Sequence, residues 1–236
     1  MIDWQDYWDK KPRLLGETEF LKQVGRTSKG KPVSDEQIDL LVSTLFQGLE
    51  LASTDTVMDL CCGNGLITYK FAQSCRKVFG VDYSIPLMEV AKKHHSLPNI
   101  QYIQSSVLEI DPSKFAGDDV IDKVAMTDAL QHFETTQFRT ILTKISMGLA
   151  DKGIVFFSGV PDKSRMDNFL DRSGSLAPGS EKRDAARNAI GSWWDRAFIT
   201  ETADDMGYRC QILDQHNDLL TSHYRFDIRL EKSTPS

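Results

Sequence analysis

Short apolar runs alternate with longer amphipathic stretches along the middle of the chain. Five apolar runs are predicted to be strands, at residues 57–61, 77–81, 100–104, 122–127 and 154–159. Helices are predicted to begin near Gly65, Ser84 and Thr135, and Ile85 and Pro86 after Ser84 suit a first helical turn. Strands that alternate with helices predict a parallel sheet with right-handed crossovers.

A helix with one buried face is predicted ahead of this core. Residues 34–37 match a capping box, and Val33 and Ile38 are spaced for a hydrophobic staple. Apolar residues then recur at helical spacing, at Ile38, Leu41, Val42, Leu45, Phe46 and Leu49. The preceding residues include several aromatic side chains but show little periodicity. Residues 1–50 are therefore expected to form an N-terminal cap and helix.

Two strands are predicted near the end of the chain, at residues 207–213 and 224–230, with a short connection. The second alternates cleanly between apolar and polar positions, which is typical of an antiparallel edge strand. We expect one domain of 236 residues, with its core at residues 51–160 and a C-terminal helix and hairpin at residues 196–236.

A long polar stretch separates the core from the last strands. Residues 162–192 are rich in charged residues, serine and glycine, and they lead into Trp193 and Trp194. Long insertions in compact domains are often lids, so residues 161–195 are predicted to be one. The alternative is a solvated connection with a short helix around residues 181–190.

The most informative motif lies where the first core strand meets its helix. Asp59 lies on the strand, a small-residue loop holds Gly63 and Gly65, and the next strand ends in Asp82. Glycines allow a ligand close to the backbone, and a carboxylate at the second strand can bind ribose hydroxyls. A dinucleotide fingerprint is not completed, because its third position is Thr68. Asp59 also favours a ligand with a cationic part over a pyrophosphate.

These motifs resemble the first two motifs of class I S-adenosylmethionine-dependent methyltransferases. The likeness rests on Asp59-x-x-x-Gly63-x-Gly65 and on the sequence Gly-Val-Asp-Tyr-Ser around Asp82, and it extends over roughly residues 50–160. It implies a Rossmann-like α/β fold with a seven-stranded, mostly parallel sheet, an antiparallel last strand and helices on both faces. Cys61 departs from the family's usual glycine, and a positive φ there would strain a cysteine.

The resemblance also implies S-adenosylmethionine as cofactor, with S-adenosylhomocysteine as product. Asp82 and Tyr83 are expected at the ribose and adenine, and Ser106 stands where the family commonly has an acidic residue. Core packing remains an alternative for Leu87, and turn chemistry remains one for Ser106. The implied cofactor-binding residues are Asp59, Cys61, Gly63, Asn64, Gly65, Asp82, Tyr83, Leu87, Ser106, Val107 and Thr127.

Catalytic candidates follow the fourth core strand, where the family places the transferable methyl group. The chain lacks the Asn/Asp-Pro-Pro-Tyr/Phe motif of many amino-methylating enzymes, which favours a small-molecule acceptor, most often a hydroxyl. His132 is the candidate general base, and Asp128 is placed to orient it or to accept the proton instead. The alternative is a structural His132, with catalysis by alignment alone.

Five residues outside the core are candidates for substrate binding. Arg26 is expected to bind a carboxylate or phosphate of the substrate, or the methionine carboxylate, although it can equally be a solvated loop charge. Trp193, Trp194, Tyr224 and Arg225 are expected to line a pocket for a sugar-like or flat acceptor. The tryptophans have an alternative role as anchors between lid and core.

Composition narrows the setting and the partners. With a net charge of −6 and no block of lysine and arginine, the chain is not expected to bind nucleic acid. No run approaches ~18 apolar residues, so no membrane partner is expected, and the acidic start argues against a signal peptide. Four cysteines without a metal-type pair indicate reduced thiols, a cytoplasmic protein and no metal site. A monomer or homodimer is expected.

The function that these expectations favour is methyl transfer from S-adenosylmethionine to a small-molecule hydroxyl, on a sugar or natural-product intermediate. Methylation of nitrogen or carbon on a small molecule is an alternative. Two further alternatives are a non-catalytic module that binds S-adenosylmethionine and a nicotinamide-dependent oxidoreductase. Asp59 and Thr68 disfavour the oxidoreductase, because its loop should accept a pyrophosphate.

Overall fold

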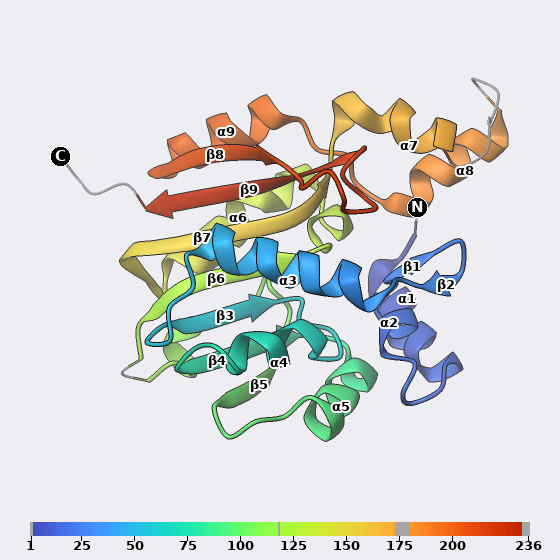
Figure 1. Cartoon of the computed structure of the whole chain (residues 1–236). Helices are drawn as coiled ribbons and strands as arrows, with labels where there is room; N and C mark the ends of the chain where they lie inside the picture. The colour runs from blue at the N-terminus through green and yellow to red at the C-terminus, as the bar shows by residue number, and fades with distance from the viewer. Residues whose placement is uncertain (1, 118, 173–179, 233–236) are drawn as a thin grey trace.

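A seven-stranded sheet runs through the centre of the computed structural model, which describes residues 2–117, 119–172 and 180–232 (Figure 1). The strand order is β5-β4-β3-β6-β7-β9-β8. The strands are β3 (Thr56–Leu60), β4 (Lys77–Asp82), β5 (Ile100–Gln104), β6 (Ile121–Thr127), β7 (Leu149–Pro161), β8 (Tyr208–Asp214) and β9 (Arg225–Lys232). Neighbours from β5 to β7 are parallel, whereas β9 is antiparallel to β7 and β8. The predicted sheet and its antiparallel last strand are confirmed.

The predicted position of β9 at the sheet edge is wrong. This strand lies between β7 and β8, so β8 forms the edge. Its apolar face carries the buried Phe226, Ile228 and Leu230, but Arg225 and Asp227 on the opposite face are also buried. The alternation of apolar and polar residues therefore separates an apolar layer from buried charges rather than from solvent.

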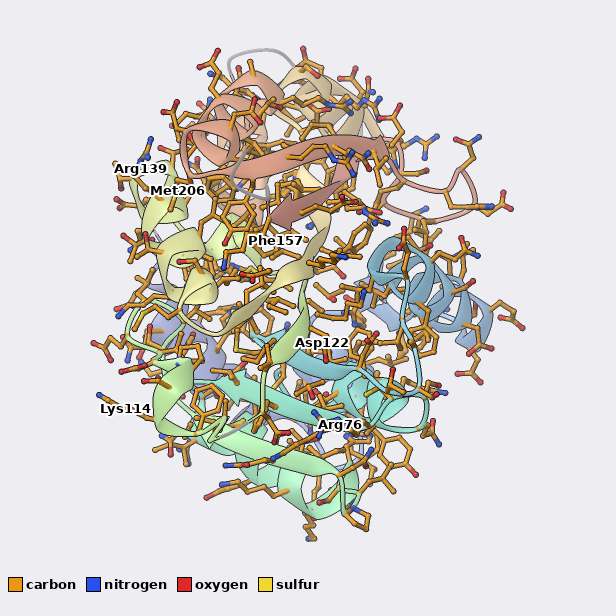
Figure 2. All side chains as sticks on the ribbon, turned by 90° about the vertical axis from the view of Figure 1, so that its left-hand side faces the viewer. Arg76, Lys114, Asp122, Arg139, Phe157 and Met206 are labelled. Carbon is orange, nitrogen blue, oxygen red and sulfur yellow. The ribbon has the colours of Figure 1, made fainter. Side chains whose placement is uncertain are left out.

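Helices cover both faces of the sheet, as the turned view shows (Figure 2). On one face α3 (Asp35–Leu49) and α4 (Leu66–Ala72) bury a cluster that includes Leu45 and Phe71. On the other, α6 (Phe138–Ser146) and α9 (Arg196–Asp205) bury the larger cluster, to which Phe157 of β7 belongs. In addition, α5 (Ile85–His94) packs on β5. No helix in the described ranges has the length and apolar character needed to cross a bilayer.

The predicted capping box of α3 does not form. Ser34 is the N-cap residue, but its side chain makes no capping hydrogen bond. The Gln37 side chain instead donates to the Asp218 carbonyl (2.7 Å) and accepts from the Leu220 amide (2.9 Å). Because the Gln37 side chain is bonded to the β8–β9 connection, it is not available for the capping box at the start of α3.

The N-terminal segment lies at the carboxyl ends of the parallel strands, the end toward which the β3 arrow points (Figure 1). We call residues 2–33 the cap. It consists of α1 (Trp4–Lys10), the 3-10 helix η1 (Lys11–Leu14), α2 (Phe20–Gln23) and a small hairpin of β1 (Thr27–Ser28) and β2 (Lys31–Pro32).

The polar insertion forms two helices, α7 (Met166–Arg172) and α8 (Glu181–Ile190), so the short helix expected around residues 181–190 is present. Arg183 joins them through ion pairs with Asp167 (2.6 Å) and Asp171 (3.0 Å). Four further 3-10 turns complete the described elements: η2 (Pro112–Lys114), η3 (Leu130–His132), η4 (Thr135–Gln137) and η5 (Lys163–Arg165). The division into cap, core, lid and C-terminal hairpin stays a prediction.

The contact between α3 and β7 yields a stability prediction. A Cβ atom at Gly48 of α3 would overlap the Phe156 ring of β7. Alanine favours a helix over glycine by about 1 kcal/mol, but overpacking a core costs about 1–3 kcal/mol. Because three ring atoms of Phe156 would be overlapped, the cost lies in the upper half of that range, and we expect Gly48→Ala to lower the free energy of unfolding by about 1–2 kcal/mol in urea titrations.

Ser43→Ala, on the exposed side of α3, is the matched control and should leave stability unchanged or slightly higher. A Gly48→Ala protein as stable as the parent would show that α3 does not approach β7 this closely.

Candidate functional site

A hollow of about 340 Å³ opens at the carboxyl ends of β3, β4 and β6, between their loops and the cap. The carboxyl edge of a parallel sheet is where ligands bind in this class of fold. Ten of the eleven predicted cofactor-binding residues line the hollow, all except Gly65. Asp128, His132 and Arg26 also line it, so the structure brings together the predicted cofactor and catalytic groups.

Three residues of the β3–α4 loop adopt positive φ angles: Cys61 (55°), Gly63 (56°) and Gly65 (79°). The strain expected at Cys61 is therefore present, because this region suits glycine and not a cysteine. A Cβ at Gly63 would lie 2.9 Å from Val24 of the cap. A Cβ at Gly65 would overlap the Tyr102 hydroxyl, so Gly65 allows close packing on β5 and does not contact the hollow.

Two buried carboxylates face the hollow. Asp59 accepts a hydrogen bond from the Thr68 hydroxyl (2.6 Å), and Asp82 accepts from the amides of Gly63 (2.8 Å) and Ser84 (2.9 Å). Burial raises the pKa of Asp59 to about 7 and that of Asp82 to about 6. Removal from water penalises the charged form, and the hydrogen bonds only partly offset this penalty. A ligand with a cationic group and hydroxyl donors would complete the site.

The wall beside Asp82 is apolar with few free polar groups. Leu87 and Val107 are both buried and line the hollow. The Ser106 hydroxyl accepts from the Leu108 amide at 3.3 Å, which is the turn chemistry left open for this residue. The Tyr83 hydroxyl donates to the Trp4 carbonyl (2.8 Å), so Tyr83 also anchors the cap.

Asp128 is clamped by two arginines at the end of β6. Its backbone has a φ of 51°, and its carboxylate pairs with Arg26 (2.6 Å) and Arg225 (3.5 Å). Gly159 of β7 lies so close that a Cβ there would overlap the Asp128 carboxylate. Arg225 is buried behind Asp128 and donates to the Gly159 carbonyl, outside the hollow. Its predicted contact with substrate is therefore replaced by a contact that holds Asp128.

His132 lies between two tryptophans of α1. The ring centroids of Trp4 and Trp8 are 4.3 Å and 5.4 Å from that of His132. Its Nδ1 atom is buried and has no hydrogen-bond partner among the described residues. Burial, reinforced by the nearby Arg225 and Lys11 charges, lowers the pKa of His132 to about 3. The imidazole is therefore neutral near pH 7 and is a weak base in this arrangement.

The cap supplies the wall that the sequence identified least clearly. Trp4, Gln5, Trp8 and Val24 line the hollow. Two tryptophans four residues apart lie on one face of a helix, which is the signal that could have identified them.

Hydrogen bonds attach the cap to the loops that carry the predicted cofactor residues. The Ser84 hydroxyl donates to the Trp8 carbonyl (3.0 Å), and the Asn64 amide donates to the Phe20 carbonyl and the Gln23 side chain (both 2.9 Å). The side-chain amide of Asn64 is thus directed at the cap. The loops that surround the hollow and the cap that covers it form one hydrogen-bonded unit.

The other predicted substrate residues lie elsewhere. Trp194 is fully buried, with Phe138 and Phe198 around it at centroid distances of 5.5 Å and 6.4 Å. Its predicted pocket role is wrong, because it is part of the core. Trp193 and Tyr224 pack on each other at 6.0 Å, outside the hollow. None of the described residues of the insertion lines the hollow, so its predicted role as a lid gains no support.

No group of three or more histidine, cysteine, aspartate or glutamate side chains in the described ranges is arranged to hold a metal ion. Besides amide, hydroxyl and thiol groups, the hollow is lined by carboxylates, one arginine and one imidazole. Their chemistry suits an organic ligand with hydroxyl and charged groups.

Residues 57–153 match the family model described as a methyltransferase domain. A 2-phytyl-1,4-naphtoquinone methyltransferase from Nostoc sp. (strain PCC 7120) is 38% identical over 63 residues, which cover 24% of this chain and 28% of that protein. A probable cobalt-precorrin-6B C(15)-methyltransferase from Methanocaldococcus jannaschii is 28% identical over 116 residues, or 49% of this chain and 55% of that protein. The chain thus spans about a quarter to a half of these relatives.

Solved structures share the fold over almost the whole chain. Magnesium protoporphyrin IX methyltransferase from Synechocystis PCC 6803 with bound SAH has a TM-score of 0.63 at 18% identity and covers 98% of both chains. The DhpI–SAH complex has a TM-score of 0.62 at 15% identity, over 98% of this chain and 96% of that one. At these identities the likeness establishes the fold, including the elements outside the matched domain.

The buried carboxylates predict how stability depends on pH. Because the pKa values of Asp59 and Asp82 are raised in the folded state, that state binds more protons than the unfolded chain between about pH 4 and pH 7. This contribution to stability is complete below about pH 4 and is lost progressively as the pH rises to about 7. In Asp59→Asn the amide oxygen can still accept from Thr68, and the charge is gone.

We expect Asp59→Asn to be more stable than the parent by roughly 1–3 kcal/mol at pH 8, with a smaller difference at pH 5, in urea unfolding at a series of pH values. Asp39→Asn, at an exposed position of α3, is the control and should follow the parent. Parallel curves for Asp59→Asn and the parent would show that Asp59 does not carry this penalty.

Proposed function

We propose that this chain, which belongs to the class I S-adenosylmethionine-dependent methyltransferases, transfers a methyl group from that cofactor to a hydroxyl group of a small molecule. The observation that carries the proposal is the pair of buried carboxylates, Asp59 and Asp82, in one hollow at the carboxyl edge of the sheet. The donor combines what such a pair can bind, a cationic amino-acid part and a ribose diol.

The lining of the hollow fits this cofactor. Asp82 would accept from the ribose hydroxyls, and Leu87 and Val107 would flank the adenine. Asp59 and the loop at Cys61 would face the ammonium end, where a positive charge relieves the cost of burying a carboxylate. When bound, S-adenosylmethionine supplies a methyl group activated by its sulfonium.

Arg26 is placed to bind a carboxylate. Among the described residues, the Arg26 side chain donates a hydrogen bond to Asp128, through Nη1 alone. The positive charge of Arg26 also lowers the pKa of Asp59. It therefore lies between the two strand ends that would flank the amino-acid part of the donor. We assign Arg26 to the donor carboxylate, with an anionic group of the acceptor as the alternative.

A small-molecule acceptor fits the side chains at one end of the hollow and the names of the relatives. The end of the hollow near β6 is lined by Asp128, His132 and Phe133, together with the tryptophans of α1. The naphthoquinone and precorrin in the relatives' names are organic ring compounds and not macromolecules, which supports a small-molecule acceptor. A hydroxyl is favoured because His132 offers a neutral nitrogen that can accept its hydrogen bond.

Alignment is the main contribution of these residues to the reaction. A neutral His132 holds the acceptor's O–H and fixes the direction of the oxygen lone pair, and Asp128 is kept in place by its two arginines. Near-attack placement at ~3–3.5 Å accounts for much of the rate enhancement in a displacement at carbon. As the proton leaves the hydroxyl, His132 or Asp128 accepts it.

Ligand binding tests the cofactor assignment first. In isothermal titrations we expect micromolar affinity for S-adenosylhomocysteine and none for NAD. Asp82→Ala should weaken S-adenosylhomocysteine binding about 10- to 100-fold, because hydrogen bonds to a charged acceptor are lost. Asp151→Ala, at an exposed position beside Lys232, is the control. Binding of NAD alone would overturn the proposal in favour of an oxidoreductase.

Turnover tests the catalytic assignment once an acceptor screen has found a substrate. His132→Ala should lower kcat about 100-fold, at the low end for acid–base groups because its imidazole is a weak base in the closed site. Affinity for S-adenosylhomocysteine should stay within about twofold of the parent. If His132→Ala and Asp128→Ala both keep full turnover, neither residue is the base and alignment alone drives the reaction. Tight cofactor binding without turnover of any acceptor would indicate a non-catalytic module.

A further inference from the structure

The acceptor end of the hollow is filled by the protein's own aromatic rings. Trp4 covers the His132 ring at a centroid distance of 4.3 Å and an interplanar angle of 53°, and Trp8 contacts it edge-on at 5.4 Å. We propose that the acceptor is a flat aromatic hydroxyl compound whose ring replaces Trp4 over His132, so that α1 is a gate that exchanges with the acceptor. This inference rests on the proposed methyl transfer at the same site.

The first step of the argument is space. Small-ligand pockets enclose about 300–1,000 Å³, so a hollow of about 340 Å³ is near the lower end of that range. It suits one ligand of the size of the donor and leaves little room for a second. The Trp4 indole occupies the space next to His132, and a ligand that replaced it would contact the imidazole.

The second step is the unpartnered nitrogen of His132. A buried polar atom without a hydrogen bond costs about 1–3 kcal/mol, and the Nδ1 atom of His132 is in this condition while α1 is closed. Trp4 and Trp8 bring rings to the imidazole but no hydrogen bond to Nδ1. A ligand that offers both a flat ring and a hydroxyl keeps the stacking and satisfies the nitrogen.

The third step is the weak attachment of α1. No residue of this seven-residue helix is buried. Its hydrogen bonds to the loop after β4 are those from the hydroxyls of Tyr83 and Ser84 to the carbonyls of Trp4 and Trp8. Its two tryptophans are half-buried and no residue of α1 reaches the core, so a ligand that replaces their contacts can displace α1 without unfolding the core.

The charged groups around this end of the hollow already have partners within the protein. The charged groups around this end are Arg26 and Arg225, both paired with Asp128, and Lys11, whose Nζ lies 4.8 Å from the Trp8 ring. A hydroxyl on a neutral ring therefore needs only the unprotonated His132 nitrogen as its hydrogen-bond acceptor.

The test uses 2-naphthol as probe, titrated calorimetrically into the protein saturated with S-adenosylhomocysteine. Decahydro-2-naphthol has the same hydroxyl without the flat ring, and 2-methoxynaphthalene has the ring without the O–H. We expect 2-naphthol to bind at least about 10-fold more tightly than either. His132→Phe should reduce its affinity to that of 2-methoxynaphthalene. Equal affinities, or no binding of 2-naphthol, would overturn the proposal.

Trp4→Ala separates a gate from a fixed wall. If the indole must be displaced, its removal should tighten 2-naphthol binding about 3- to 10-fold, whereas loss of a wall would weaken it. Leu14→Ala, at an exposed position just beyond α1, is the matched control and should leave the affinity unchanged. Weaker binding to a folded Trp4→Ala protein contradicts the gate.

Hydrogen exchange of the unmodified protein tests the movement of α1 without a substitution, so misfolding of a variant cannot affect the result. Saturation with 2-naphthol should speed the exchange of the α1 amides and leave those of α3 unchanged. Greater protection of the α1 amides would show that α1 closes over the acceptor, and it would overturn the proposal that the acceptor displaces α1. A failure of S-adenosylhomocysteine to bind is a separate outcome: it rejects the cofactor assignment, and titration of 2-naphthol into the free protein then still tests the gate.

Discussion

The burial of two carboxylates at one end of a parallel sheet is the constraint on which the site depends. Strands β3 and β4 run side by side in register, so Asp59 and Asp82 lie near the same edge, and the charge of each disfavours the charge of the other. Nearby donors meet part of the cost: the Thr68 hydroxyl and the amides of Gly63 and Ser84. The desolvation cost that these donors do not offset can be met by a ligand that brings positive charge and hydroxyl donors, so the site favours such a ligand.

The part of this arrangement that could be predicted from the sequence is the part encoded at short range. Asp59, Gly63 and Asp82 lie within 24 residues of each other, and the strand-loop-helix order alone brings them to one edge. The strands β3, β4 and β7 were predictable because each buries a nearly continuous apolar run, whereas β5 has no buried residue and was predicted from its position in the alternation of strands and helices. The cap was harder to predict, because α1 is only seven residues long and its Trp4 and Trp8, four residues apart on one face, pack on the site and not on the core.

Buried charge explains the other departures. An alternating strand predicts a solvated face, yet the polar face of β9 buries Arg225 against Asp128, and Asp227 against Ser158 and Gly159. Such a network leaves no signature in periodicity, because a buried charge and a solvated one occupy the same positions in the pattern. The misplacement of Trp194 has a related cause: sequence separation cannot tell whether an aromatic residue faces a pocket or the core.

The attachment of the cap has a consequence for the order of events at the site. Tyr83 and Ser84, which hold the carbonyls of α1, directly follow Asp82, which would hold the ribose. A ligand bound by Asp82 therefore lies beneath the helix that these two residues anchor, and any movement of α1 is felt first at that loop. Binding equilibria that share one element are reciprocally linked, so an α1 that moves as proposed would couple binding at Asp82 to binding at His132. A single short helix without a buried residue is enough for this coupling, because its contacts fall on both ends at once.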